Sequence, residues 1–149
     1  PQYFETDIIG TGFSGLLAAI RLQQRRLDDF VLLERSSELG GTWRDNAYPG
    51  AEVDIPTGLY SLSFVPYPFR KRYAPQSELL DYTHHIIEKF HLRERARTNQ
   101  AVTRLIWDEK LCVWHVEVAS GERYVARRRA LYTPQPLHPC EGCGTCWSL

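Results

Sequence analysis

The segment DIIGTGFSGL, residues 7–16, places a glycine-rich turn between a pattern typical of a buried strand and one typical of a helix. The apolar strand pattern ends at Ile9, and from Leu16 to Leu22 apolar side chains recur at helical spacing. A second buried-strand pattern follows at residues 30–33 and ends at an acid, Glu34. Strand, glycine turn, helix and strand in this order predict a right-handed crossover in a parallel sheet.

The spacing of these glycines indicates a dinucleotide-binding turn. Gly10 would permit the tight turn, Gly12 would let a pyrophosphate approach the backbone, and Gly15 would let the helix pack closely on the strand. The N-terminus of the helix offers N–H groups and partial positive charge to phosphates. Glu34, 19 residues after Gly15, can accept hydrogen bonds from both ribose hydroxyls and would repel a 2′-phosphate. The pattern predicts FAD or NAD at this first site, and the alternative is an ordinary glycine turn followed by a surface glutamate.

The rest of the chain predicts a Rossmann-like α/β fold with a small antiparallel β-meander insertion. Residues 39–73 mix Gly and Pro with aromatic side chains, which indicates a long but ordered loop. A helix is predicted from Ser77, as N-cap, to Phe90. The meander is predicted at residues 102–107, 113–118 and 123–126, and a further parallel strand at 130–133. The three arginines at 127–129 are expected to guard a solvated strand edge.

Composition excludes several classes of function. Eighteen basic and 18 acidic residues give a net charge of zero, which offers no electrostatic footprint for nucleic acid. No apolar run is long enough to span a membrane. Three of the four cysteines (Cys140, Cys143 and Cys146) lie in the last ten residues, which is unlike a disulfide framework and favours a reducing, cytoplasmic compartment. Because a fourth ligand is lacking near these cysteines, no metal site is predicted.

Further motifs resemble a known family. GGTW at residues 40–43, NAYPG at 46–50, DIP at 54–56 and YSLSF at 60–64 follow the glycine turn in the order typical of class B flavoprotein monooxygenases. The run from Tyr48 to Asp54 is most similar to the Baeyer–Villiger monooxygenases. The resemblance implies FAD in the first nucleotide-binding domain and NADPH in a second. It also implies that a C4a-peroxyflavin, formed with O2, inserts one oxygen into a ketone or adds it to a soft nitrogen or sulfur of a small organic substrate.

The resemblance also implies which residues contact the cofactor. The positions that match the family pattern are Gly10, Gly12, Phe13, Ser14, Gly15, Glu34, Arg35, Gly41, Thr42, Trp43, Asp54, Tyr60 and Val102. Asp54 is implied to be catalytic, at the junction of flavin and nicotinamide, whereas by itself it could cap the turn at Pro56. Trp43 and Tyr60 could equally be packing aromatics.

The sequence leads us to expect an incomplete enzyme. Residues 1–133 are predicted to form the front part of an FAD-binding domain, and residues 134–149 an irregular tail rich in Cys and Pro that a frame error or an aberrant end would explain. No second glycine motif for NADPH occurs, so the isolated chain is expected to bind FAD weakly at best and not to oxidise NADPH. The alternatives are a flavin disulfide reductase that uses the cysteine tail, and a non-catalytic truncated product. The pattern specifies neither the substrate nor the oligomeric state.

Overall fold

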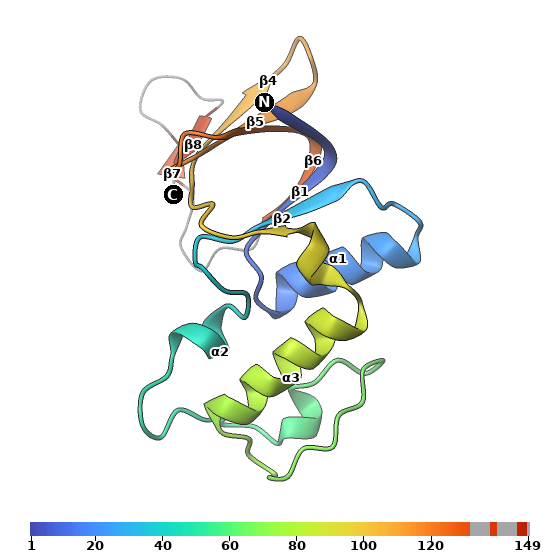
Figure 1. The fold of residues 1–149 in the computed structure, drawn as a ribbon, viewed down its shortest axis with the longest axis vertical. Helices are drawn as coiled ribbons and strands as arrows, with labels where there is room; N and C mark the ends of the chain where they lie inside the picture. The colour runs from blue at the N-terminus through green and yellow to red at the C-terminus, as the bar shows by residue number, and fades with distance from the viewer. Residues whose placement is uncertain (132–137, 140–145, 149) are drawn as a thin grey trace.

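One eight-stranded sheet, in the order β3-β2-β1-β6-β5-β4-β8-β7, organises the chain (Figure 1). The computed structural model describes residues 1–131, 138–139 and 146–148. The strands are β1 (Gln2–Ile9), β2 (Phe30–Leu33), β3 (Ala96–Arg97), β4 (Val102–Asp108), β5 (Val113–Val118), β6 (Arg123–Leu131), β7 (His138–Pro139) and β8 (Cys146–Ser148). The helices are α1 (Phe13–Gln24), α2 (Thr42–Asp45) and α3 (Gln76–Lys89), with 3₁₀ turns at Thr57–Leu59 and Leu92–Arg95.

The first half of the sheet is parallel. β1 pairs in parallel with both β2 and β6, and β2 pairs in parallel with β3. Ile9 lies opposite Leu33 at the end of β1, and the amide of Gly10 donates to the carbonyl of Leu33 at 2.9 Å. The chain therefore leaves β1 through the glycine turn at the carboxyl edge of the sheet, which confirms the predicted Rossmann-like α/β class.

The second half is the antiparallel meander β4-β5-β6. The predicted separate strands at 123–126 and 130–133 are one strand, because β6 pairs with β5 through Arg123–Ala126 and continues along β1 to Leu131. The arginines between them do not break the strand, since Arg128 and Arg129 pair with Thr6 and Asp7 of β1. Arg127 also forms an ion pair with Glu5 of β1 at 3.2 Å. They lie beyond the residues that pair with β5, and Arg129 is half-buried rather than a solvated edge guard. Residues 132–133 of the prediction lie outside the described residues.

Helix α3 begins two residues before the predicted start. Its N-cap is Pro75 rather than Ser77, and the amides of Glu78 and Leu79 donate to the Pro75 carbonyl. Ser77 therefore lies in the first turn, where the fixed backbone angle of the preceding proline sets the entry of the helix. Figure 1 shows α1 between the sheet and α3, with α2 and the segment from α2 to α3 at the far end of the molecule.

The long segment between α2 and α3 is ordered by two buried polar side chains. The hydroxyl of Tyr82 in α3 donates to the carbonyl of Val65 at 3.1 Å and accepts from the amide of Leu62 at 2.8 Å. The hydroxyl of Thr57 donates to the carbonyl of Arg72 and accepts from the amide of Ala74. These bonds replace the ladder of a regular element, so an irregular segment can hold fixed positions.

Two apolar clusters lie on opposite faces of the parallel strands β1 and β2. The first packs α1 and α3 on β1 and β2, with Ile8, Leu16, Ile20, Leu32, Tyr82 and Ile86 among its members. The second joins the parallel strands to the meander through Ile9, Val31, Leu33, Val102, Leu105, Val116, Val118 and Tyr124. In the segment where the sequence predicted no regular element, β8 pairs with β4, and β7 pairs with β8.

Candidate dinucleotide site

The glycine turn after β1 has a steric reason for two of its three glycines. Gly10 has a φ of +92°, a conformation that side chains disfavour. At Gly15, an added Cβ would lie 2.0 Å from the carbonyl oxygen of Gly10 and 3.6 Å from Ile8. The predicted roles of these two residues, a tight turn and close packing of helix on strand, agree with this geometry.

A second glycine loop lies against the first. Gly41 has a φ of +58°, and an added Cβ would lie 2.5 Å from the Cα of Gly12. Gly12 itself has ordinary extended angles (φ −73°, ψ −179°), and the nearest atom to an added Cβ is the Cα of Gly41 at 3.8 Å. Neither backbone conformation nor a protein neighbour therefore requires glycine at position 12.

The N-terminus of α1 opens beside these glycines without a cap. Its N-cap is Gly12, no side chain caps it, and no acidic residue lies in its first turn. Leu16 donates the first helical hydrogen bond to Gly12 at 3.0 Å, while Ser14 in the first turn is exposed. The helix leaves its first amides and the positive end of its dipole available to an anion.

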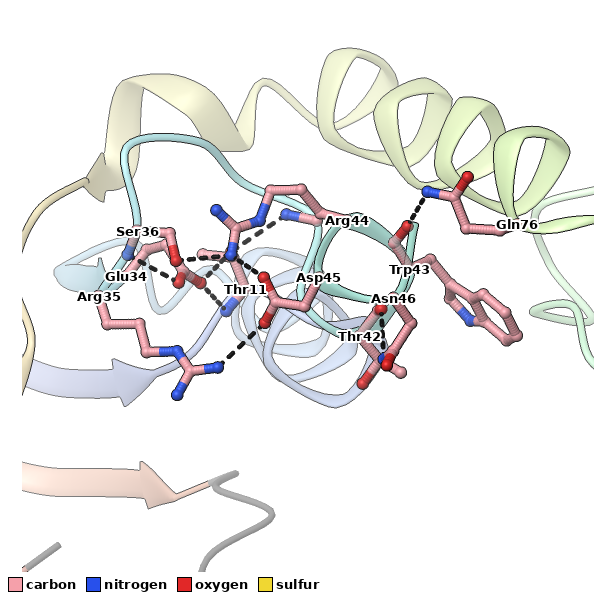
Figure 2. Close-up of polar contacts among 11 residues, drawn as sticks. Thr11, Glu34, Arg35, Ser36, Thr42, Trp43, Arg44, Asp45, Asn46 and Gln76 are labelled. Carbon is pink, nitrogen blue, oxygen red and sulfur yellow. Dashed lines mark hydrogen bonds and ion pairs between the residues drawn. The ribbon is translucent and has the colours of Figure 1, made fainter. Parts of the chain in front are cut away.

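The Glu34 carboxylate is buried and already hydrogen-bonded to the chain (Figure 2). Its Oε2 accepts from the amide of Thr11 at 3.0 Å and from the Thr11 hydroxyl. Its Oε1 accepts from the amide of Ser36 at 3.1 Å. The Thr11 hydroxyl in turn accepts from the amide of Gly40 at 3.3 Å. The acid thus joins the end of β2 to both glycine loops, and it is not the surface glutamate of the alternative interpretation.

A charged network covers the same side of the site. Arg35, with 63% of its side chain exposed, pairs with Asp45 of α2 at 3.0 Å. Arg44, also in α2, contacts both Asp45 and the hydroxyl of Ser36. Figure 2 shows these side chains beside Glu34 and Thr11. Thr42, the first residue of α2, is exposed.

The predicted aromatic residues meet one another. Tyr60 lies 5.6 Å from Phe13 and 5.6 Å from Trp43, measured between ring centroids, and Trp43 Nε1 donates to the Tyr60 hydroxyl at 3.2 Å. Gln76 of α3 donates to the carbonyl of Trp43. The packing role of these aromatics is therefore real, and it places Phe13, at the start of α1, in contact with the loop that carries the remaining predicted residues.

Asp54 lies next to this aromatic cluster. Its neighbour Val53 is buried with Leu79 and packs against Trp43, and the amide of Val53 donates to the carbonyl of Ala74. The side chain of Asp54 is exposed. Within the described residues its carboxylate accepts no hydrogen bond from the turn at Pro56, so the cap interpretation gains no support.

Val102 is buried at the start of β4, in the cluster that contains Ile9 and Leu33. The segment before it runs along Glu34, whose amide donates to the Arg97 carbonyl at 2.9 Å and whose carbonyl accepts from Gln100 at 2.8 Å. Backbone pairing thus brings β4 beside the acid, although the two lie far apart in sequence.

Sequence reasoning missed Thr11, Ser36 and Arg44. Thr11 occupies a variable position of the glycine motif, so spacing alone carries no signal for it. It also missed Asp7, a fully buried acid within β1, although an acid inside an apolar strand pattern is itself a signal.

The described part of the chain lacks two other kinds of feature. It holds no group of three or more His, Cys, Asp or Glu side chains arranged to bind a metal ion. It also holds no helix with the length and apolar character needed to cross a bilayer. Cys140 and Cys143 lie outside the described residues, and only the backbone of Cys146 is described.

Comparisons with known proteins identify the family. The model of the NAD(P)-binding Rossmann-like domain matches residues 8–82. A Baeyer–Villiger monooxygenase of Pseudomonas aeruginosa is 43% identical over 84% of this chain and 24% of its own length. Another, of Streptomyces coelicolor, is 40% identical over 80% of this chain and 23% of its own. The chain spans about a quarter of the length of these curated relatives.

Solved structures give the same result. A steroid monooxygenase bound to NADP superposes with a TM-score of 0.84 at 31% identity, over 95% of this chain and 28% of that one. The chain therefore belongs to the NAD(P)-binding Rossmann-like family, and its predicted resemblance to the Baeyer–Villiger monooxygenases is confirmed.

Proposed function

We propose that this chain binds FAD, weakly in isolation, and forms the FAD-holding part, residues 1–133, of an NADPH-dependent flavoprotein monooxygenase of Baeyer–Villiger type. One observation carries the proposal: Gly12 lies at the uncapped start of α1, and nothing in the described protein requires it to be glycine. A ligand that must approach the backbone at this point explains the missing side chain, and a pyrophosphate suits the free amides beside it.

The surrounding residues fit the remaining parts of FAD. The amides of Phe13, Ser14 and Gly15 would bind the pyrophosphate, with Gly10 shaping the turn. The buried carboxylate of Glu34 would bind the adenosine ribose. The other proposed contacts are Arg35, Gly41, Thr42, Trp43, Asp54, Tyr60 and, at the adenine end, Val102.

FAD would supply hydride acceptance and the activation of O2, and the protein would position it and exclude water. Asp54 is the proposed catalytic residue, because an exposed carboxylate beside the Trp43–Tyr60 pair could face a second nucleotide. The proposed substrates are small organic ketones or compounds with a soft nitrogen or sulfur, in the cytoplasm. Because the sequence holds one glycine-rich nucleotide turn, we expect the isolated chain not to oxidise NADPH.

Titration of the chain with FAD, followed by flavin fluorescence and equilibrium dialysis, tests the proposal. Gly12→Ala should weaken FAD binding at least about tenfold with an unchanged thermal midpoint, because its Cβ meets the ligand rather than the protein. Gly58→Ala is the matched control, since an added Cβ there lies in open space and should change neither quantity.

Two outcomes contradict the proposal. One is equal FAD affinity for Gly12→Ala and the unsubstituted chain. The other is no saturable binding of FAD to the unsubstituted chain up to about 1 mM, which corresponds to only about 4 kcal/mol of binding free energy.

A further inference from the structure

Thr11 occupies an unusual place in the glycine turn. Its side chain is fully buried, although it stands between two glycines at a position where the spacing motif asks for no particular residue. Its hydroxyl donates to Glu34 and accepts from the amide of Gly40, so both hydrogen-bonding functions of the group are used. Its amide donates to the same carboxylate oxygen at 3.0 Å.

These bonds determine which part of the Glu34 carboxylate remains free. A carboxylate has about four acceptor positions, two on each oxygen. Thr11 occupies both positions of Oε2, and the amide of Ser36 occupies one position of Oε1. One acceptor position remains, on Oε1. The carboxylate cannot rotate without breaking a hydrogen bond in a buried site, where an unpaired acceptor is costly.

We propose that Thr11 is a positioning residue: it holds Oε2 of Glu34 so that Oε1 alone accepts a hydroxyl of the adenosine ribose. This inference rests on the proposed binding of FAD and adds a residue to it. It also revises the expectation that Glu34 receives both ribose hydroxyls, because the protein has already taken three of the four acceptor positions.

The link to Gly40 extends the effect of Thr11. Gly40 is buried and precedes Gly41, whose backbone lies so close to Gly12 that an added Cβ would be 2.5 Å from the Gly12 Cα. The Thr11 hydroxyl therefore fixes the acid and the second glycine loop together, before any ligand arrives. The site then loses less conformational freedom when the ligand binds, and the smaller entropy loss favours affinity.

Substitution at position 11 tests the proposal through FAD affinity. Thr11→Val keeps the shape of the side chain but removes the hydroxyl, and should weaken FAD binding about tenfold or more. Thr11→Ser restores the hydroxyl and should recover affinity to within about threefold of the unsubstituted chain. Thr11→Ala serves as a second hydroxyl-free variant if Thr11→Val does not fold.

Two further measurements separate positioning from a merely structural role. In a double-mutant cycle, Thr11→Val should cost much less affinity once Glu34→Ala has removed the carboxylate, because only the hydrogen bond to the Gly40 amide is then lost. The second measurement compares AMP with 2′,3′-dideoxy-AMP, which lacks the ribose hydroxyls. The unsubstituted chain should prefer AMP, and Thr11→Val should abolish most of that preference.

Each result decides for or against the role of Thr11. Additive losses in the cycle, equal weakening of both AMP probes, or no recovery with Thr11→Ser would overturn it. If the unsubstituted chain binds FAD and Thr11→Val binds it equally well, the positioning role fails while the proposed function stands. If the unsubstituted chain binds neither FAD nor AMP, the proposed function fails as well.

Discussion

Two buried carboxylates on neighbouring parallel strands have opposite surroundings. Glu34, at the end of β2, is 4% exposed and accepts three hydrogen bonds from Thr11 and Ser36. Asp7, within β1, is 0% exposed, and neither of its oxygens has a hydrogen-bond partner among the described residues. The two carboxylates are similarly buried, but Glu34 has three of its four acceptor positions occupied, whereas Asp7 has none occupied by a group that the structure describes. In the glycine-turn region, backbone and side-chain groups donate hydrogen bonds to Glu34. At the junction of the sheet and the meander, Asp7 is buried without such donors in the described part of the chain.

The surroundings of Asp7 explain why its neighbour does not satisfy it. Arg129 lies opposite Asp7 in the pairing of β1 with β6, but its guanidinium lies over the ring of Trp114, 3.4 Å from the centroid. One guanidinium nitrogen of Arg129 is buried without a partner as well. Burial raises the pKa of the Asp7 carboxyl to about 7, while its own backbone amide and the charge of Arg129 act against this shift.

The largest expected effect is a dependence of stability on pH that Asp7 creates. Since the pKa in the folded state lies above the ordinary value of 3.8, the folded state favours the protonated acid. The contribution of Asp7 to the free energy of unfolding should be highest below about pH 4, fall by at most about 4 kcal/mol as the pH rises through about 7, and then level off. Urea unfolding from pH 4 to 8 should show this fall in the unsubstituted chain and a much flatter profile in Asp7→Asn.

Glu5→Gln is the control for this series, because Glu5 is an acid on the same strand with 43% of its side chain exposed and its own partner, Arg127. It should leave the fall in place. If Asp7→Asn retains the full fall between pH 4 and 7, Asp7 is not the titrating group and the contrast with Glu34 loses its main consequence.

In the glycine-turn region, the same change from carboxylate to amide should lower the free energy of unfolding, whereas Asp7→Asn should raise it. Glu34→Gln replaces a charged acceptor of three hydrogen bonds by an amide, whose NH₂ group cannot accept from Thr11 or Ser36. We expect a loss of about 2 kcal/mol at pH 8, where Asp7→Asn should stabilise the chain. Urea unfolding of both variants at one pH measures the two signs directly, and equal signs would contradict the contrast.

The glycine turn was predictable from sequence because its demands are local. The positive φ of Gly10 and the close approach of Gly15 to Gly10 both arise within six residues. The spacing of these glycines is therefore enough to predict β1, α1 and β2. The resemblance to a family supplied the other site residues, and the structure brings Trp43 and Tyr60 together with Phe13.

Long-range contacts were not predictable in the same way. β6 is one strand because it pairs with β1, which lies more than a hundred residues earlier, and no local pattern contains that pairing. Thr11 gains its role only when β2 delivers Glu34 beside it. Asp7 lies in a strand with buried neighbours on both sides, and the sequence does not say that Arg129 is stacked on Trp114 instead.

The smallest expected effect concerns a third carboxylate, and it shows why burial matters to the comparison. Asp45 accepts from two arginines, Arg35 and Arg44, so by partner count it resembles Glu34. However, 35% of its side chain and 63% of that of Arg35 are exposed, and water can replace the partners. Asp45→Asn should therefore cost less than about 1 kcal/mol, and 1 M NaCl should remove most of that difference through screening.

Urea unfolding at low and high salt measures the stability loss of Asp45→Asn, with Glu34→Gln as the salt-insensitive reference. A loss at Asp45 as large as that at Glu34 would mean that the number of donors decides stability regardless of solvent, and would break the distinction drawn between the buried acids.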